Sequence, residues 1–141
     1  MAEQTGVKIG DGPVRFSFAY RDLLSDQGVG IHAWGDVDGK EVELLRFDCF
    51  GREPHYHYGP ENRNERLMLD KTAEGDPLEW TLKQLRERLP DMVRRAGYDK
   101  LADSIDATVM GSALDELASA TRKMALERRV TVKHDRGDVI V

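Results

Sequence analysis

Two histidines stand one residue apart in the segment PHYHYGPE, residues 54–61. On an extended strand, residues two apart project from the same face, about 7 Å apart along the chain. The imidazoles of His55 and His57 could therefore bind one divalent metal ion, zinc or a similar cation, if carboxylate or thiolate groups completed the site. The predicted metal ligands are His55, His57, Glu61 and Asp48, with Cys49 and His32 as further candidates for the third position.

The same pair has two other interpretations. His55 and His57 could act as an acid and a base without a metal, for example in RNA cleavage. They could also hydrogen-bond to backbone or carboxylate groups at the end of a strand, with Tyr56 and Tyr58 packed on the other face. The sequence leaves these three roles open and makes His55 and His57 the candidate catalytic residues.

Arginine is the only basic side chain type other than histidine between residues 41 and 70. A guanidinium binds phosphate or carboxylate through paired hydrogen bonds, which suits a ligand-binding surface. Acidic side chains are interleaved with these arginines, so a mesh of surface ion pairs explains them equally well. The candidate binding residues are Arg46, Arg52, Tyr56, Tyr58, Arg63 and Arg66.

Composition limits the classes of protein to consider. The chain has 141 residues, which fits a single domain with one core. Its net charge of −5 disfavours binding to nucleic acid and to anionic membranes, and leaves a local Arg/His patch as the one route to nucleic acid. The single Cys49 cannot form an internal disulfide, and no signal peptide or membrane span is visible. We therefore expect a cytoplasmic protein of bacterial type.

The elements that must position these residues change near residue 76. Alternating apolar residues predict strands over 14–20, 29–35 and 41–50, and a further strand over 65–69. The pair Asp38-Gly39 lies between two of these runs and is typical of a β-hairpin turn. An antiparallel meander of about four strands follows from this pattern.

The second half reads as helical. Asp76 and Pro77 form a helix start, and leucines at helical spacing follow up to a break expected at Pro90. Another helix is expected from Ser112, and short strands over 130–132 and 139–141. The predicted fold is one α+β domain over 1–141, with a loose arm (1–12), a β-rich half (13–70), a helical half (76–128) and a short β tail (129–141).

Two resemblances follow from these motifs. The spacing His55-x-His57-x-x-x-Glu61 resembles the first metal-binding motif of the cupins, but the glycines of that motif and the second motif are missing, so a cupin fold is rejected. The order of elements resembles small bacterial toxin proteins of the TumE type, in which a meander, an Asp-containing stretch (here 46–50) and a His-containing turn (here 55–57) precede a helix. This resemblance covers residues 14–95 and implies an RNA-directed toxin.

Two classes of function remain. The first is a small accessory or interaction protein, with a protein partner or self-association through the apolar stripes of its helices. The alternative is a small enzyme that uses His55 and His57, either metal-dependent or a TumE-like RNA-directed toxin. No complete catalytic constellation can be written from the sequence, which favours the first class.

Overall fold

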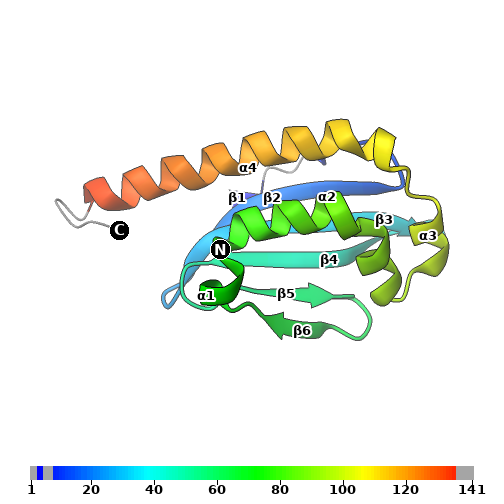
Figure 1. The fold of residues 1–141 in the computed structure, drawn as a ribbon, viewed down its shortest axis with the longest axis horizontal. Coiled ribbons are helices and arrows are strands. Elements are labelled where there is room, and N and C mark those ends of the chain that lie inside the picture. The colour runs from blue at the N-terminus through cyan, green and yellow to red at the C-terminus, as the bar shows by residue number, and fades with distance from the viewer. Residues whose placement is uncertain (1–2, 5–7, 136–141) are drawn as a thin grey trace.

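The structure, a computed structural model, describes residues 3–4 and 8–135, and side chains over 8–128. The described strands form one six-stranded antiparallel sheet in chain order, an uninterrupted meander (Figure 1). Its strands are β1 (Glu3–Gln4), β2 (Val14–Asp22), β3 (Gln27–Val37), β4 (Lys40–Phe50), β5 (His55–Tyr58) and β6 (Glu65–Met68). The α+β class and the N-terminal antiparallel meander are confirmed, with two more strands than expected.

The β3–β4 hairpin turns at the predicted Asp38-Gly39 pair. Both residues have positive φ, 52° at Asp38 and 78° at Gly39. A two-residue turn of this hand matches the twist of the flanking strands, and Asp and Gly tolerate it best. The turn therefore sets the register of the two longest strands.

A bulge interrupts this register at Leu44. Ala33 lies opposite Leu45, but the next residue, Trp34, lies opposite Glu43, so Leu44 is extra. Leu44 and Leu45 are adjacent in sequence and both fully buried. An extra residue shifts the alternation of the strand by one. Odd-numbered residues therefore face the core after the bulge, but Glu43, just before it, faces the other side.

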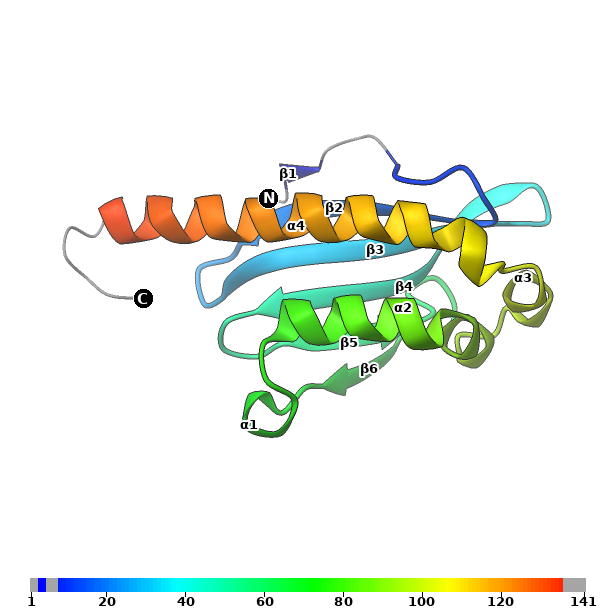
Figure 2. The ribbon, with the colours of Figure 1, turned by 45° about the horizontal axis from the view of Figure 1, so that its top comes forward.

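Helices α2 (Pro77–Arg95) and α4 (Ala107–Asp135) both lie on one face of the sheet, as Figures 1 and 2 show together. Helix α2 contacts β4 and β5, and α4 contacts β2 and β3. The short helices α1 (Lys71–Glu74) and α3 (Asp99–Asp103) precede and follow α2. The opposite face of the sheet is covered by neither long helix, and we call it the open face.

The core fills the layer between the helices and the sheet. It is made by alternate strand residues and by the leucine stripes of the two long helices. Its largest fully buried side chains include Phe16, Ile31, Phe47, Leu85 and Leu117. Because these residues use one side of each strand, the intervening side chains must project from the open face.

Helix α2 begins where the sequence predicts it. The Asp76 carboxylate accepts the Glu79 backbone N–H at 3.0 Å, and Pro77 takes the first helical position. The helix is distorted at Arg88, two residues before the expected break at Pro90, and ends before Gly97, which has a φ of 105°. Within the described residues, no helix has the length and apolar character to cross a membrane.

The last helix departs from expectation at both ends. It begins at Ala107 rather than Ser112, because Asp106 caps it by accepting the backbone N–H groups of Thr108 and Val109. It continues to Asp135, so the strand predicted over 130–132 is wrong. Extending an existing helix avoids the cost of nucleation, which outweighs the β preference of two valines and a threonine. The strand predicted over 139–141 lies outside the described residues.

The N-terminal arm is also more regular than predicted. Glu3 and Gln4 pair with Tyr20 and Ala19 of β2, and Ile9 forms a bridge to Phe16. Ile9 is buried in the core, which ties this part of the arm to the sheet.

Candidate metal centre

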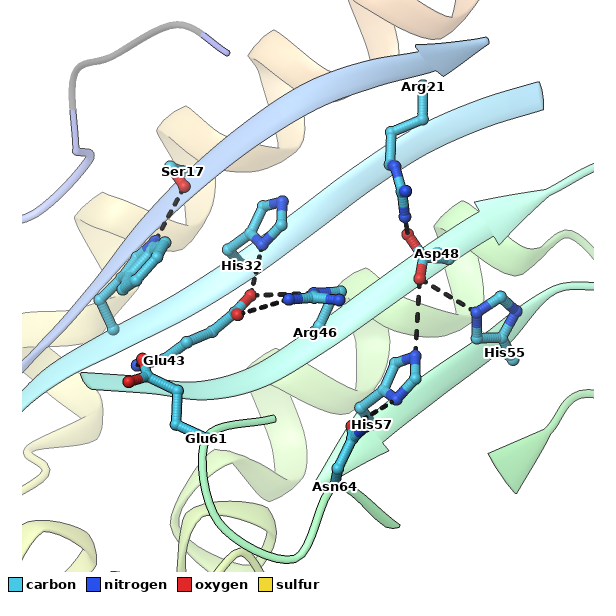
Figure 3. Close-up of polar contacts among 11 residues, drawn as sticks. Ser17, Arg21, His32, Glu43, Arg46, Asp48, His55, His57, Glu61 and Asn64 are labelled. Atoms are coloured by element: carbon cyan, nitrogen blue, oxygen red, sulfur yellow. Dashed lines mark hydrogen bonds and ion pairs between the residues drawn. The ribbon is translucent and has the colours of Figure 1, made fainter. Parts of the chain in front are cut away.

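Three potential ligands meet on the open face, between β4 and β5. Asp48 lies directly opposite His55 in the ladder, and His57 lies opposite Arg46. The Asp48 Oδ2 atom is 3.1 Å from His55 Nε2 and 3.8 Å from His57 Nε2. One ligand atom from each residue lies within 4.8 Å of the other two, and Figure 3 shows both imidazoles turned toward the carboxylate.

The second nitrogen of each imidazole is already engaged. His55 Nδ1 donates to the Glu53 backbone carbonyl at 2.9 Å, and His57 Nδ1 donates to Asn64 Oδ1 at 2.9 Å. A carbonyl oxygen can only accept, so each Nδ1 carries the proton. In a neutral ring, Nε2 then holds a lone pair that faces Asp48. Metal-binding histidines in proteins are oriented in the same way by an acceptor on the far nitrogen.

The Asp48 carboxylate is also held in one orientation. Asp48 is 1% exposed, and its Oδ1 accepts a hydrogen bond from Arg21 Nη1 at 2.9 Å. Arg21 reaches across β3 at Gly30, where a Cβ atom would lie 3.3 Å from the Arg21 Cδ. The absence of a side chain at Gly30 therefore lets Arg21 hold one oxygen of Asp48 and leaves Oδ2 for the space between the histidines.

These separations match the needs of a small cation. Zinc bonds to nitrogen and oxygen of about 2.0 to 2.1 Å at tetrahedral angles place ligand atoms about 3.3 Å apart. Two of the three separations, 3.1 and 3.8 Å, lie on either side of that value. All three ligand atoms lie within 4.8 Å of one another, so they must draw closer together to bind one ion.

Burial keeps one of the rings in its metal-binding form. Burial lowers the pKa of His57, and the nearby His55 lowers it further, which outweighs the opposite effects of Asn64 and Asp48. A lowered pKa favours the neutral imidazole, the form whose nitrogen can bind a metal.

A second polar cluster lies beside this group on the open face. Glu43 is 4% exposed, and its carboxylate accepts from Arg46 Nε at 3.1 Å and Nη2 at 2.8 Å. The same carboxylate lies 2.5 Å from His32 Nδ1. Burial alone would raise the pKa of Glu43, but the hydrogen bonds from His32 and Arg46 leave it lowered. The cluster is thus an anionic carboxylate held by two donors.

The structure separates the other predicted ligands from the three that meet. The Glu61 carboxylate accepts the Glu43 backbone N–H at 2.5 Å. The Cys49 thiol contacts Thr81 Oγ1 of α2 on the helix-covered side, and burial raises its pKa to about 12. The predicted ligand His32 belongs to the second cluster. Asp48, His55 and His57 therefore remain as the candidate ligand set.

The predicted binding residues are divided between the two faces. Tyr56 stacks on Phe47 and contacts Trp80 of α2, so it faces the helices, as does the buried Tyr58. Arg63 donates to the Arg95 carbonyl at the end of α2. Arg46 lies in the second cluster and Arg66 is the ladder partner of His57, while exposed Arg52 follows β4 in a bend.

Two residues of the site were not singled out from the sequence. Arg21 contacts a residue 27 positions away, and no local pattern indicates such a contact. Asn64 has a φ of 48°, and the turn composition of residues 59–64 was a signal for a left-handed Asn, though not for its partner.

Comparison with known proteins places the site within a family. The model of a domain of unknown function, DUF7700, matches residues 8–121. The chain belongs to the DUF7700 family. None of the curated proteins and none of the solved structures matches the chain. The resemblance to TumE-type toxins therefore stays a prediction.

The matched DUF7700 region contains every residue of the candidate centre and of its supports. It runs from before β2 into α4, and so includes Arg21, Asp48, His55, His57 and Asn64. The candidate centre of this chain thus lies within the part that matches the family model.

Proposed function

We propose that this DUF7700 protein binds one divalent transition metal ion, zinc or a similar cation, through Asp48, His55 and His57. The observation that carries the proposal is the orientation of the two imidazoles. Each gives its Nδ1 proton to a fixed oxygen and turns Nε2 toward the same carboxylate oxygen. When both rings are neutral, their Nε2 lone pairs and the Asp48 carboxylate can bind one cation.

The ligand set favours a catalytic over a purely structural metal. Structural zinc sites are closed by four protein ligands, whereas catalytic sites use three and leave a position for water or substrate. Here three ligands converge on a face that neither long helix covers. A bound metal would supply a Lewis acid and an activated water at its open position. We therefore propose a small metal-dependent enzyme, the alternative that the sequence left open.

Metal titration tests this proposal. Metal-free protein titrated with Zn²⁺, Mn²⁺ and Fe²⁺ in a calorimeter should take up one equivalent of at least one ion. His55→Ala, His57→Ala and Asp48→Asn should each abolish that uptake while the circular dichroism spectrum is unchanged. His134→Ala, which removes a histidine at the end of α4, is the matched control and should bind like the wild type. Absence of stoichiometric binding by the wild-type protein would remove the proposal.

An interaction role is a second candidate, supported by a different surface. A groove of about 730 Å³ lies between the β2–β3 turn and the helices. Leu24 and Leu126 line it and are exposed, at 111% and 59%. Exposed apolar side chains beside a groove suit a protein partner or a second copy of the chain. Molar mass in solution, compared with that of Leu24→Ser/Leu126→Ser, tests self-association: an unchanged monomer would exclude it.

A further inference from the structure

A carboxylate in the β2–β3 turn binds the segment that joins β4 to β5. Asp26 Oδ1 accepts the Gln27 N–H at 3.0 Å and the Arg52 N–H at 2.9 Å. Asp26 Oδ2 accepts the Glu53 N–H at 2.8 Å. Arg52 and Glu53 belong to residues 51–54, which lie between the two strands. Hydrogen bonds to an ionised carboxylate are about twice as strong as those between neutral groups, so Asp26 is a strong anchor for this segment.

The meander brings the two connections together. Every second connection of an antiparallel meander lies at the same end of the sheet, and Figure 1 shows the β2–β3 turn and segment 51–54 at one end. The Gly51 N–H also donates to the Gln27 carbonyl at 3.0 Å. The two strands approach closely here, because a Cβ atom at Gly28 would clash with the Cys49 carbonyl oxygen. Glycine at position 28 therefore allows the contact between the turn and the segment.

Segment 51–54 carries the oxygen that orients His55. The His55 Nδ1 atom donates to the Glu53 carbonyl at 2.9 Å. The N–H of the same residue, Glu53, is the group that Asp26 Oδ2 holds. Glu53 is thus bonded at both of its backbone polar groups, to the anchor on one side and to the imidazole on the other. A single residue connects the Asp26 carboxylate to the ring of His55.

The middle of the segment depends on Asp26. Residues 51–53 are exposed and form bends outside the ladder. The ends of the segment are tied separately, since the carbonyl groups of Gly51 and Pro54 accept hydrogen bonds from other parts of the chain. Exposed segments with few buried contacts open at a low cost in free energy. Without the Asp26 carboxylate, the Glu53 carbonyl would therefore lose its fixed position.

We propose that Asp26 is a positioning residue for the metal centre. It holds Glu53, whose carbonyl fixes the His55 ring with Nε2 turned toward Asp48. This inference rests on the proposed metal site. The two imidazoles are then supported in different ways. A side chain holds His57 directly, whereas His55 is held by a backbone carbonyl that a carboxylate from another turn keeps in place.

Zinc affinity, measured by competition with a chromophoric chelator, tests this role. We expect Asp26→Ala to bind zinc about tenfold more weakly, the lower end of the usual effect of losing a partner behind a metal ligand. Asp26→Asn keeps one acceptor oxygen, so its affinity should fall between those of Asp26→Ala and the wild type. Asp22→Ala is the matched control, because it removes the same charge from the exposed end of β2. It should bind zinc like the wild type.

A second measurement separates positioning from a general loss of stability. Proton NMR of the zinc-loaded protein follows the exchange with water of the Nδ1 protons of His55 and His57, which is slow while these protons are hydrogen-bonded. Asp26→Ala should speed the exchange of the His55 proton. The His57 proton, which Asn64 accepts, should exchange as in the wild type. Thermal unfolding of the metal-free variants checks the fold, and if Asp26→Ala does not fold, Asp26→Asn takes its place in both measurements.

The outcomes distinguish this inference from the metal proposal. Wild-type zinc affinity in Asp26→Ala, or unchanged exchange of its His55 proton, would overturn the role of Asp26 and leave the metal site standing. Equally faster exchange at His55 and His57 would also overturn it, because the effect would not be specific to one ligand. A wild-type protein that takes up no zinc would overturn this inference, and one that takes up no metal at all would overturn both.

Discussion

Asn64 offers the sharpest test of how the metal centre is oriented. Its side chain accepts the Nδ1 proton of His57 at 2.9 Å, and its backbone has a φ of 48°. The Asn64 N–H also donates to the Gly59 carbonyl at 2.7 Å, so the turn is held independently of the side chain. Asn64→Gly therefore removes the support of His57 without straining the backbone, since glycine adopts positive φ freely.

We expect Asn64→Gly to weaken zinc binding by about tenfold to a hundredfold, the usual effect of losing a partner behind a metal ligand. His57 is the more loosely placed ligand, 3.8 Å from Asp48 Oδ2 against 3.1 Å for His55, so it depends most on this support. Asn64→Asp keeps an acceptor and makes the hydrogen bond charge-assisted, which should preserve or tighten binding.

Competition with a chromophoric zinc chelator measures both affinities, and thermal unfolding of the metal-free proteins checks the fold. If Asn64→Gly bound zinc as tightly as the wild type while Asn64→Asp bound it more weakly, orientation of His57 by Asn64 would be refuted. The reasoning about both imidazoles would then lose its support.

Two further predictions concern the core and the single thiol. Leu117→Ala, at a fully buried position of α4, should lower the free energy of unfolding by about 2 to 5 kcal/mol in urea titrations, and a loss below 1 kcal/mol would contradict its place in the core. Cys49 should resist a thiol reagent in the native protein and react in urea, because burial raises its pKa to about 12. Because the folded state favours the neutral thiol, Cys49 contributes fully to stability below the ordinary thiol pKa of 9.0. This contribution is lost as the pH rises from 9.0 toward 12. Unfolding measured from pH 8 to 11 should thus show a fall in stability that is smaller in Cys49→Ala; equal slopes would contradict the thiol's contribution.

The pattern of a few neighbouring residues was enough to predict most strands of the sheet. The alternation of Phe16, Phe18 and Tyr20 predicted β2, and Asp38-Gly39 predicted the turn that joins β3 to β4. The His-x-His spacing correctly predicted that both rings share one face of a strand. These signals succeed because a period of two and a positive-φ turn are properties of a few neighbouring residues.

Which side chains of neighbouring strands share a face of the sheet could not be predicted in the same way. A slip of one residue exchanges the two faces of a strand, so the positions of His32 and Asp48 depended on the exact register. The structure places both on the open face, but Glu43 reaches His32 only because of the bulge. Glu61, three residues beyond the HYHY strand, instead accepts a backbone N–H of β4.

Strand propensity gave a wrong prediction at the end of α4 for a related reason. Val130, Thr131 and Val132 favour strands as isolated residues, but here they follow a helix that is already packed on β2 and β3. Tertiary packing upstream decides their conformation, and a window of a few residues does not contain that information.

The bulge at Leu44 lets β4 contribute to the core and to both polar clusters. In a strand of strict alternation, Glu43 would share the inward side of Leu45 and Phe47, and a carboxylate there would be costly to bury. The single extra residue sends Leu44 inward and brings Glu43 out to His32, while Asp48 keeps its place opposite His55. One strand therefore buries two consecutive leucines and still presents carboxylates on both sides of them to the open face.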